Sequence, residues 1–331
     1  MNKINMNGRK VAVTGAAGFI GSHLTEQLLA AGAQVKALIR YNSRSDTGWL
    51  KDSQQHPNLQ IISGDIRDPF QVRNFLTDID TVFHLAALIA IPFSYQAPQS
   101  YLETNINGTL NLLEAAKAHK LRQIVLTSTS EVYGTARRVP IDEEHPLQPQ
   151  SPYSASKIAA DMMGRAYGSS FDLPVVIVRP FNTYGPRQSM RAVIPTIITQ
   201  ALDGHQIRLG DLRPVRDFNY VADTAAGFIA AACGNCQRGE TFNLATGRGV
   251  SIGETVEIIG NLLDKKLEII EEENRLRPPD SEVMRLIGDA GRAAQQLGWQ
   301  PLHSLEEGLR QTVEWLKSNR GEYQQSRQYH Y

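Results

Sequence analysis

The chain has 331 residues, of which 41% are hydrophobic, so it can bury a large core and is long enough for two domains. Lysine plus arginine and aspartate plus glutamate each total 34, which makes the formal net charge zero. This balance argues against nucleic acid or an anionic membrane as the main partner, because either would favour an excess of basic residues. A small anionic ligand remains compatible with it, since a few local arginines are enough to bind one.

Strands and helices alternate along the first half of the chain. The expected strands are 10–14, 34–39, 59–64, 81–85, 123–127 and 174–178, and the expected helices are 23–31, 68–76, 105–117 and 153–167. This alternation predicts an α/β fold with a Rossmann-type, doubly wound parallel sheet and helices on both faces.

After about residue 180 the alternation breaks, and prolines separate short mixed elements. Helices are expected at 194–202, 255–263 and 305–318. We therefore predict a dinucleotide-binding Rossmann domain at 1–180, to which later segments return. Residues 181–331 are expected to form mainly a smaller C-terminal α/β lobe that binds the substrate.

The cysteine content and the length of the apolar runs indicate the cellular compartment in which the protein is expected. Cys233 and Cys236 are too few for a disulfide framework, and no second Cys or His pair with ligand spacing accompanies them. We interpret them as small residues at a helix end and predict no metal site. No apolar run reaches the ~18 residues that span a bilayer, and the first ten residues lack an apolar signal core. The cytoplasm is the expected compartment.

The first strand leads into a glycine-rich turn, TGAAGFIG, at residues 14–21. Gly15 permits a tight turn, Gly18 lets the backbone approach a pyrophosphate, and Gly21 lets the next helix pack on the sheet. Phe19 and Ile20 lie in the same turn and are also expected to bind the cofactor, and the free N–H groups at the start of the following helix suit phosphate. The spacing is GxxGxxG rather than GxGxxG, but its position after the first strand indicates a dinucleotide site.

The end of the second strand selects the cofactor, since an acidic residue there favours NAD and an arginine favours NADP. This strand ends Leu-Ile-Arg-Tyr-Asn-Ser-Arg with no acidic residue, so Arg40, beside Ser43 and Arg44, predicts NADP. If Arg40 only stacks on adenine, NAD remains the alternative. The adenine is expected at Asp65 and Ile66, and the rest of the dinucleotide along Leu85, Ala86 and Ala87.

Tyr153 and Lys157 are four residues apart on an expected helix, so they share one face. Tyrosine, with an ordinary pKa of ~10, is a weak base at neutral pH. A nearby ammonium stabilises the phenolate, so we expect Lys157 to lower the pKa of Tyr153. Such a tyrosine could take the proton of a sugar hydroxyl while the same carbon loses hydride.

These motifs strongly resemble those of the extended short-chain dehydrogenase/reductase family over nearly the whole chain. The matching segments are TGAAGFIG (14–21), GDIRD (64–68), HLAA (84–87), NINGT (105–109), STSEVYG (128–134), YSASK (153–157) and RPFNTYGPRQ (179–188). The resemblance implies a seven-stranded sheet, a lobe that binds a nucleotide sugar, and a homodimer formed through a four-helix bundle. It also implies a tightly bound cofactor that is regenerated in each turnover.

Individual positions can be carried over from the resemblance. Asn105 is expected near the cofactor, and Lys157 at the nicotinamide ribose. The substrate diphosphate and ribose are expected at Asn182, Arg191, Arg216, Arg277 and Asp280. For Arg216 and Arg277, an exposed surface charge is the competing interpretation.

Thr129, Ser130 and Glu131 resemble the corresponding residues of the family's 4,6-dehydratases. Oxidation at C4 of the sugar acidifies the C5 proton, which Glu131 can remove while it assists loss of the C6 hydroxyl as water. Thr129 is expected to hydrogen-bond the C4 oxygen. Ser130 stands where some relatives carry a second acid, so Glu131 is expected to serve both steps, with Ser130 as a possible relay. A purely structural capping role is the alternative for Glu131.

Residues 151–200 most resemble dehydratases that act on UDP-N-acetylglucosamine and retain the C5 configuration. A UDP-sugar 4-epimerase, a UDP-glucuronate decarboxylase and a 5,6-dehydratase that forms an exocyclic alkene remain alternatives. The decarboxylases share the Ser-Glu pair but need an arginine cluster, which is not evident near Tyr153. A protein that only senses NADP(H) should have lost the Tyr153–Lys157 pair, which is intact here.

Overall fold

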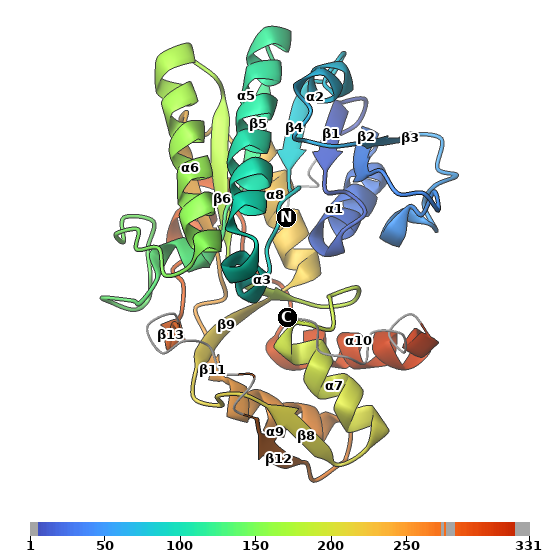
Figure 1. The fold of residues 1–331 in the computed structure, drawn as a ribbon, viewed down its shortest axis with the longest axis vertical. Helices are drawn as coiled ribbons and strands as arrows, with labels where there is room; N and C mark the ends of the chain where they lie inside the picture. Colours follow the sequence, from blue (N-terminus) through green and yellow to red (C-terminus); the bar gives the residue numbers. More distant parts are fainter. Residues whose placement is uncertain (1–5, 273–274, 276–281, 322–331) are drawn as a thin grey trace.

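The computed structural model describes residues 6–272, 275 and 282–321. A seven-stranded sheet forms one lobe, in the order β10-β6-β5-β4-β1-β2-β3, and every pairing in it is parallel (Figure 1). Its strands are β1 (Lys10–Thr14), β2 (Gln34–Arg40), β3 (Leu59–Gly64), β4 (Thr81–His84), β5 (Gln123–Thr127), β6 (Val175–Pro180) and β10 (Glu240–Leu244). The predicted Rossmann-type parallel sheet is confirmed.

Helices cover both faces of this sheet, because alternate strand residues point to opposite sides. On one face Val11, Val13 and Phe83 form a core with α1 (Phe19–Ala30) and α8 (Val221–Cys233). On the other face Ala12 and Val82 pack with α2 (Pro69–Phe75) and α5 (Gly108–His119). Next to α5 lies α6 (Pro152–Phe171), the longest of the described helices.

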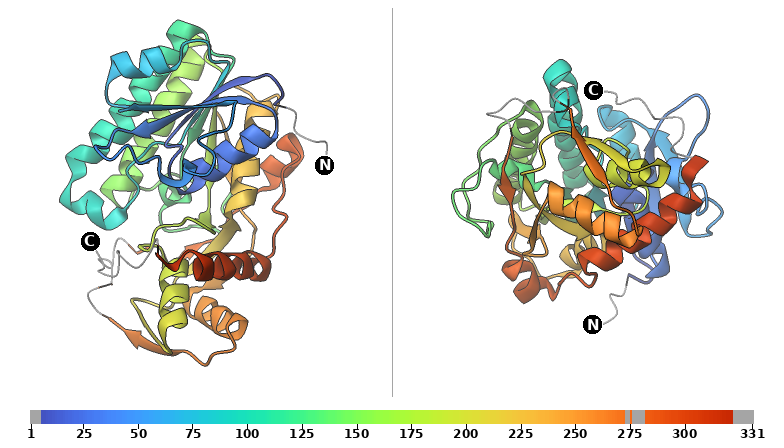
Figure 2. Two further views of the ribbon diagram at one scale, coloured as in Figure 1. Left: turned by 90° about the vertical axis from the view of Figure 1, so that its right-hand side faces the viewer. Right: turned by 90° about the horizontal axis from the view of Figure 1, so that it is seen from below.

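A second lobe lies beyond the carboxyl ends of the strands, as the two turned views show (Figure 2). The strand β9 (Val215–Tyr220) pairs with β7 (Asn182–Tyr184), β11 (Gly249–Ser251) and β13 (Arg285–Leu286). β8 (Gln206–Leu209) pairs with β12 (Glu268–Glu271). The helices α7 (Val193–Asp203), α9 (Ile252–Leu262) and α10 (Leu305–Ser318) enclose a separate apolar core with these strands.

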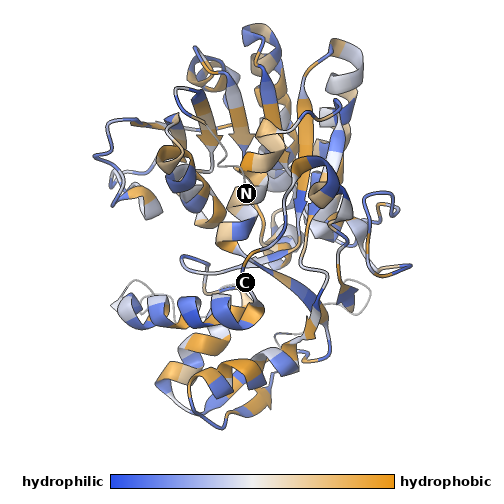
Figure 3. Ribbon diagram, turned by 180° about the vertical axis from the view of Figure 1, so that it is seen from behind, coloured by the Kyte–Doolittle hydropathy of each residue, from blue (hydrophilic) through white to orange (hydrophobic). Residues whose placement is uncertain are grey.

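Two segments return from this lobe to the large sheet. β10 pairs with β6, and α8 covers the sheet beside α1. Hydropathy colouring shows apolar residues along α8 and the strands, whereas α10 alternates hydrophilic and hydrophobic residues (Figure 3). Across the described part of the chain, no helix combines the length and apolar character needed to cross a membrane.

Local structure departs from the expected elements at two places near the site. The helix expected at 105–117 begins inside a π-helical segment, Leu102–Asn107, and α5 itself begins at Gly108. Short helices α3 (Ile91–Gln96) and α4 (Pro98–Tyr101) also occupy the connection after β4, where no helix was expected. Together they pack against the first half of α6.

Candidate active site

The turn after β1 forms a cradle that only glycine can line. Gly15 has φ +69°, and a Cβ there would lie 2.8 Å from the backbone nitrogen of Ala86. A Cβ on Gly21 would lie 2.2 Å from the Gly15 carbonyl oxygen. α1 begins at Phe19, and its N-cap residue, Gly18, has no side chain that could cap the first N–H groups. The cradle therefore fits the pyrophosphate of a dinucleotide, which backbone N–H groups can reach closely.

A buried hydrogen-bond chain fixes this turn against the end of β4. The Thr14 hydroxyl accepts from the backbone N–H groups of Leu85 and Ala86, both at 3.1 Å, and lies 2.8 Å from His84 Nδ1. His84 Nε2 lies 3.2 Å from the hydroxyl of Thr109, which donates its own proton to the Asn105 carbonyl. Nε2 must then be the donor and Nδ1 the acceptor, so His84 is neutral.

Burial sustains that neutral state, because it lowers the pKa of His84 to about 3, with a smaller contribution from the Lys157 charge. The imidazole can then donate at one nitrogen and accept at the other without carrying charge. His84 and Thr109 were not among the predicted site residues. Their positions within HLAA and NINGT were the available signal.

Asn105 joins the loop after β4 to the helix that carries Tyr153. Its side-chain oxygen accepts from the Leu88 N–H at 2.9 Å, and its nitrogen donates to the Leu88 carbonyl at 3.0 Å. The same nitrogen donates to Ser156 Oγ at 2.9 Å, and Ser156 donates to the Tyr153 carbonyl. Asn105 is fully enclosed, so its evident contribution is to hold these two backbones together.

Tyr153 is buried beside Ile91 and Tyr101, whose ring meets it edge-on with centroids 6.3 Å apart. Burial raises the pKa of the Tyr153 hydroxyl; a hydrogen bond with Thr129 opposes this rise and the Glu131 carboxylate adds to it. Lys157 Nζ donates instead to the Thr127 carbonyl at 2.6 Å. The expected lowering of the Tyr153 pKa was therefore wrong, because burial outweighs the hydrogen bond.

Glu131 lies on a short 3₁₀ turn, Ser130–Tyr133, directly after β5. Thr129 caps this turn by accepting from the Glu131 N–H at 3.2 Å, so the cap comes from Thr129 and not from the Glu131 carboxylate. Ser130 is buried, whereas Glu131 is half-buried. Within residues 6–272, 275 and 282–321, no group donates a hydrogen bond to the Glu131 carboxylate or forms an ion pair with it.

Three of the predicted substrate residues lie in the described part of the second lobe: Asn182, Arg191 and Arg216. Asn182 begins β7, and its buried side-chain oxygen has no hydrogen-bond partner among the described residues. Arg216 on β9 is buried, so it is not an exposed surface charge, and its Nη2 lies 2.7 Å from Glu282 Oε1. The Arg191 charge affects the pKa of Tyr101. Burial raises that pKa to about 12, and the positive charge of Arg191 opposes the rise. Arg277 and Asp280 lie outside the described residues.

The adenine end of the predicted site is more exposed. Arg40 ends β2 and is exposed; it forms no ion pair with the described residues, but its charge helps to lower the pKa of Asp65. The Asp65 carboxylate is held by Arg67 at 2.6 Å, and this bond keeps its pKa below the ordinary value. The Ile66 side chain is buried under α5 against Gly108. Leu85, Ala86 and Ala87 are partly exposed beside the glycine turn.

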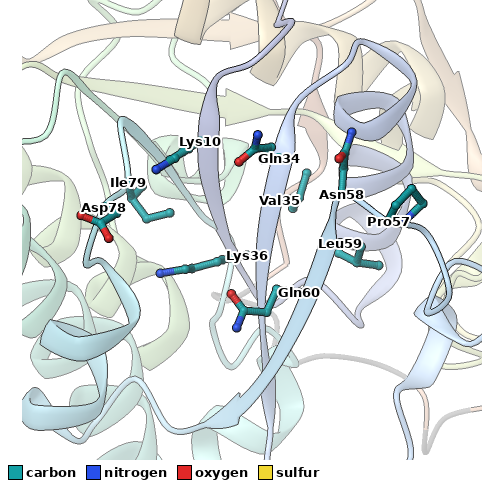
Figure 4. A pocket seen from close by; sticks show the side chains of 10 residues that line it. All are labelled: Lys10, Gln34, Val35, Lys36, Pro57, Asn58, Leu59, Gln60, Asp78 and Ile79. Carbon is teal, nitrogen blue, oxygen red and sulfur yellow. The ribbon is translucent and has the colours of Figure 1, made fainter.

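A cavity of about 460 Å³ lies elsewhere, at the amino ends of β1, β2 and β3 (Figure 4). Lys10, Gln34 and Leu59, the first residues of these strands, line it. The glycine turn, Thr129 and Glu131 all follow the carboxyl ends of strands, where ligands bind in open α/β sheets. The cavity is therefore separate from the candidate active site.

Comparison with known proteins places the chain among sugar-nucleotide enzymes. Residues 12–312 match the GDP-mannose 4,6 dehydratase family. A dTDP-glucose 4,6-dehydratase of Actinoplanes sp. is 32% identical over 319 residues, covering 94% of this chain and 98% of that protein.

Solved structures of two different activities are similar to it. DesIV, a dTDP-glucose 4,6-dehydratase from Streptomyces venezuelae with NAD and TYD bound, has a TM-score of 0.87 at 32% identity and covers 96% of this chain and 99% of that chain. A UDP-N-acetylglucosamine 4-epimerase from Methanobrevibacter ruminantium has a TM-score of 0.85 at 32% identity, with coverage of 95% and 98%. Overall similarity therefore does not separate elimination from epimerisation.

Proposed function

Since the chain belongs to the extended short-chain dehydrogenase/reductase family of nucleotide-sugar dehydratases and epimerases, we propose that it is a nucleotide-sugar 4,6-dehydratase. The observation that carries the proposal is the Glu131 carboxylate, which is near enough to Tyr153 to raise its pKa yet is bound by no neighbouring donor among the described residues. An epimerase needs only a redox pair, whereas elimination also needs an acid–base group at the next carbon.

A nicotinamide dinucleotide held at Gly15, Gly18 and Gly21 would accept hydride from C4 of the sugar and return it to C6. Tyr153 takes the proton of the C4 hydroxyl, and Thr129, already hydrogen-bonded to Tyr153, orients that oxygen. The new C4 ketone acidifies the C5 proton because the resulting carbanion is delocalised into the carbonyl. Glu131 removes this proton and then protonates the departing C6 hydroxyl, which leaves as water.

The buried Tyr153 needs positive charge nearby before it can act as a base, since burial raises its pKa. Lys157 is the cation available within one helical turn. Its present hydrogen bond to the Thr127 carbonyl holds the ammonium at the end of β5. In the proposed complex Lys157 stabilises the phenolate and contacts the nicotinamide ribose.

The proposed cofactor is NADP, with NAD as the alternative. The exposed Arg40 guanidinium, which forms no ion pair with the described residues, supports a 2′-phosphate at the end of β2. Against it, the similar DesIV structure holds NAD. Denaturing the purified protein and identifying the released dinucleotide by mass spectrometry decides between them.

The proposed substrate is UDP-N-acetylglucosamine, with its diphosphate held by Asn182, Arg191 and Arg216. The buried Asn182 oxygen, which has no partner among the described residues, and the buried Arg216 guanidinium support a polar ligand beside the paired strands β7 and β9. The choice of sugar rests on the resemblance of residues 151–200. We infer that Arg277 and Asp280 complete the diphosphate and ribose contacts.

Mass spectrometry of the product from a panel of UDP-, dTDP-, GDP- and CDP-hexoses tests the proposal. The expected product is lighter than the substrate by one water, with no net consumption of cofactor. An unchanged mass across the panel would point to epimerisation, and loss of carbon dioxide from a uronic acid to decarboxylation. NMR of a dehydrated product separates a 4-keto-6-deoxy sugar from an exocyclic alkene and reports the C5 configuration.

We also propose a homodimer formed through α5 and α6. Both helices lie side by side on one face of the large sheet (Figure 1). Leu102, just before α5, and Met162 and Phe171 on α6 are exposed apolar side chains. A second copy of the same helix pair would cover them and complete a four-helix bundle.

A further inference from the structure

A buried ion pair joins β6 to α6, the helix that carries the redox residues. Arg179, on β6, donates from Nε and Nη2 to one oxygen of Asp161, on α6, at 3.1 and 2.9 Å. The two side chains are only 1% and 2% exposed. Ser128 donates to the same Asp161 oxygen at 2.8 Å. Charges this deeply buried persist only when their hydrogen bonds are satisfied, so this arrangement has little freedom to move.

The remaining terminal nitrogen of Arg179, Nη1, contacts Tyr133. Nη1 donates to the Tyr133 hydroxyl at 3.0 Å, and that hydroxyl donates to Asn243 Oδ1 on β10 at 2.7 Å. The guanidinium carbon also lies 5.0 Å from the centre of the tyrosine ring. Tyr133 is fully buried and stacks on Phe181. Its hydroxyl therefore has one donor and one acceptor, both supplied by the sheet.

These contacts join the two halves of the proposed chemistry. Asp161 lies four residues after Lys157 and eight after Tyr153, so all three share one face of α6. Tyr133 ends the 3₁₀ turn that carries Glu131. Arg179 thus connects the helix of the redox pair to the turn of the proposed C5 base. Oxidation at C4 and proton removal at C5 concern adjacent carbons of one sugar, so the two groups must keep a fixed separation.

We infer that Tyr133, clamped between Arg179 and Asn243, is a positioning residue for proton transfer at C5. It acts through Glu131 and not by contact with the sugar, because its ring and hydroxyl are enclosed by protein. The inference rests on the proposed dehydratase function. A misplacement of about 1 Å at a reacting group can reduce a rate by roughly 10²-fold, so a small release of this turn should be measurable.

The test is Tyr133→Phe, which removes one hydroxyl and leaves the Arg179–Asp161 pair in place. The matched control is Tyr167→Phe. Tyr167 also lies on α6, but its hydroxyl donates to Glu114 and is away from Glu131. Two steps are followed with the substrate nucleotide sugar that the wild type dehydrates: appearance of reduced-cofactor absorbance in a single turnover, and solvent-deuterium entry at C5. Melting temperatures of all proteins are compared.

We expect Tyr133→Phe to slow deuterium entry and water loss by about tenfold or more, with C4 oxidation changed by less than about twofold. The control should match the wild type in both steps. Equal slowing of both steps, or no slowing of either, would overturn the inference. Arg179→Lys, which keeps a cation for Asp161 but loses the contact with Tyr133, should show the same selective loss if it folds.

The same measurement distinguishes failure of the dehydratase proposal from failure of the positioning role of Tyr133. If the wild-type protein exchanges the C5 proton of no nucleotide sugar in the panel for solvent deuterium, the dehydratase proposal fails. The inference about Tyr133 then fails too, because it depends on that proposal. If the wild type exchanges and Tyr133→Phe exchanges equally fast, only the positioning role of Tyr133 fails.

Discussion

Lys157 Nζ donates a 2.6 Å hydrogen bond to the carbonyl oxygen of Thr127, the last residue of β5. Burial lowers the pKa of Lys157, and the nearby Asp161 charge opposes that effect. One turn earlier, burial raises the pKa of Tyr153. The backbone therefore holds the Lys157 ammonium in position, and Tyr153 is protonated at neutral pH.

Thr129→Val should move the pH dependence of C4 oxidation to higher pH. The Tyr153 base must lose its proton to act, and its raised pKa makes the rate increase with pH. The Thr129 hydrogen bond lowers that pKa, so its removal raises it further. Single-turnover rates of cofactor reduction across the alkaline range measure the shift. An unchanged profile, or one moved toward acid, would contradict the proposed contact.

Glu131→Gln should abolish water loss while leaving cofactor binding and C4 oxidation. An amide cannot take the C5 proton, and loss of a general base typically costs about 10²–10⁴-fold in rate. The control is Glu144→Gln, which changes an exposed carboxylate paired with Arg292. Product mass and reduced-cofactor absorbance are followed together. Retained dehydration in Glu131→Gln would remove the residue from its proposed role.

Arg40→Ala should weaken NADP binding by about tenfold or more and leave NAD binding nearly unchanged, because only NADP carries a 2′-phosphate for the guanidinium. Isothermal titration of cofactor-free protein with each dinucleotide gives the comparison. Arg122→Ala, an exposed arginine beside Asp80 at the opposite end of the sheet, serves as control. A wild-type preference for NAD, or equal loss of both cofactors, would rule out NADP selection by Arg40.

His84 should make the free energy of unfolding fall as the pH is lowered below about 6.5. Burial keeps its folded-state pKa at about 3, below the ordinary value of 6.5. Between these values the unfolded chain binds a proton that the folded chain does not, so stability falls as pH decreases from 6.5. The contribution approaches about 1.4 kcal/mol per pH unit.

Urea unfolding of the wild type and His84→Gln at pH 6.5 and 5 isolates this contribution, since the other titrating groups are common to both proteins. We expect the variant to be less stable at pH 6.5 but to lose less stability on acidification. Parallel losses in the two proteins would show that His84 does not titrate on unfolding.

Met162→Glu should dissociate the proposed dimer, because it places a charge on the exposed face of α6 that a second copy would cover. Sedimentation velocity at several protein concentrations reports the mass. Leu302→Glu alters an exposed apolar residue just before α10, away from α5 and α6, and should leave the dimer intact. A monomeric wild type, or a dimeric Met162→Glu, would exclude this interface.

Local patterns were enough to predict the Rossmann-type sheet and the glycine turn. The strands through β6 follow from short buried runs, and the turn from Gly15, whose positive φ suits a residue without Cβ. The helix end expected at Cys233 is confirmed, since α8 ends there, but the rest of α8 and β10 were missed. α8 is buried on nearly all sides and so has no helical alternation of polar and apolar residues. β10 is identified as part of the large sheet only by its partner β6, far away along the chain.

Short segments were enough to predict which groups carry the proposed chemistry, because the spacing of the Tyr153–Lys157 pair and the motif around Glu131 are local. How these groups are held and charged follows from the folded arrangement. The raised pKa of Tyr153, the Lys157 contact with Thr127 and the Arg179–Tyr133 link depend on burial and on neighbours distant in sequence. Desolvation and hydrogen bonding act through space, and the chain order of residues does not specify them.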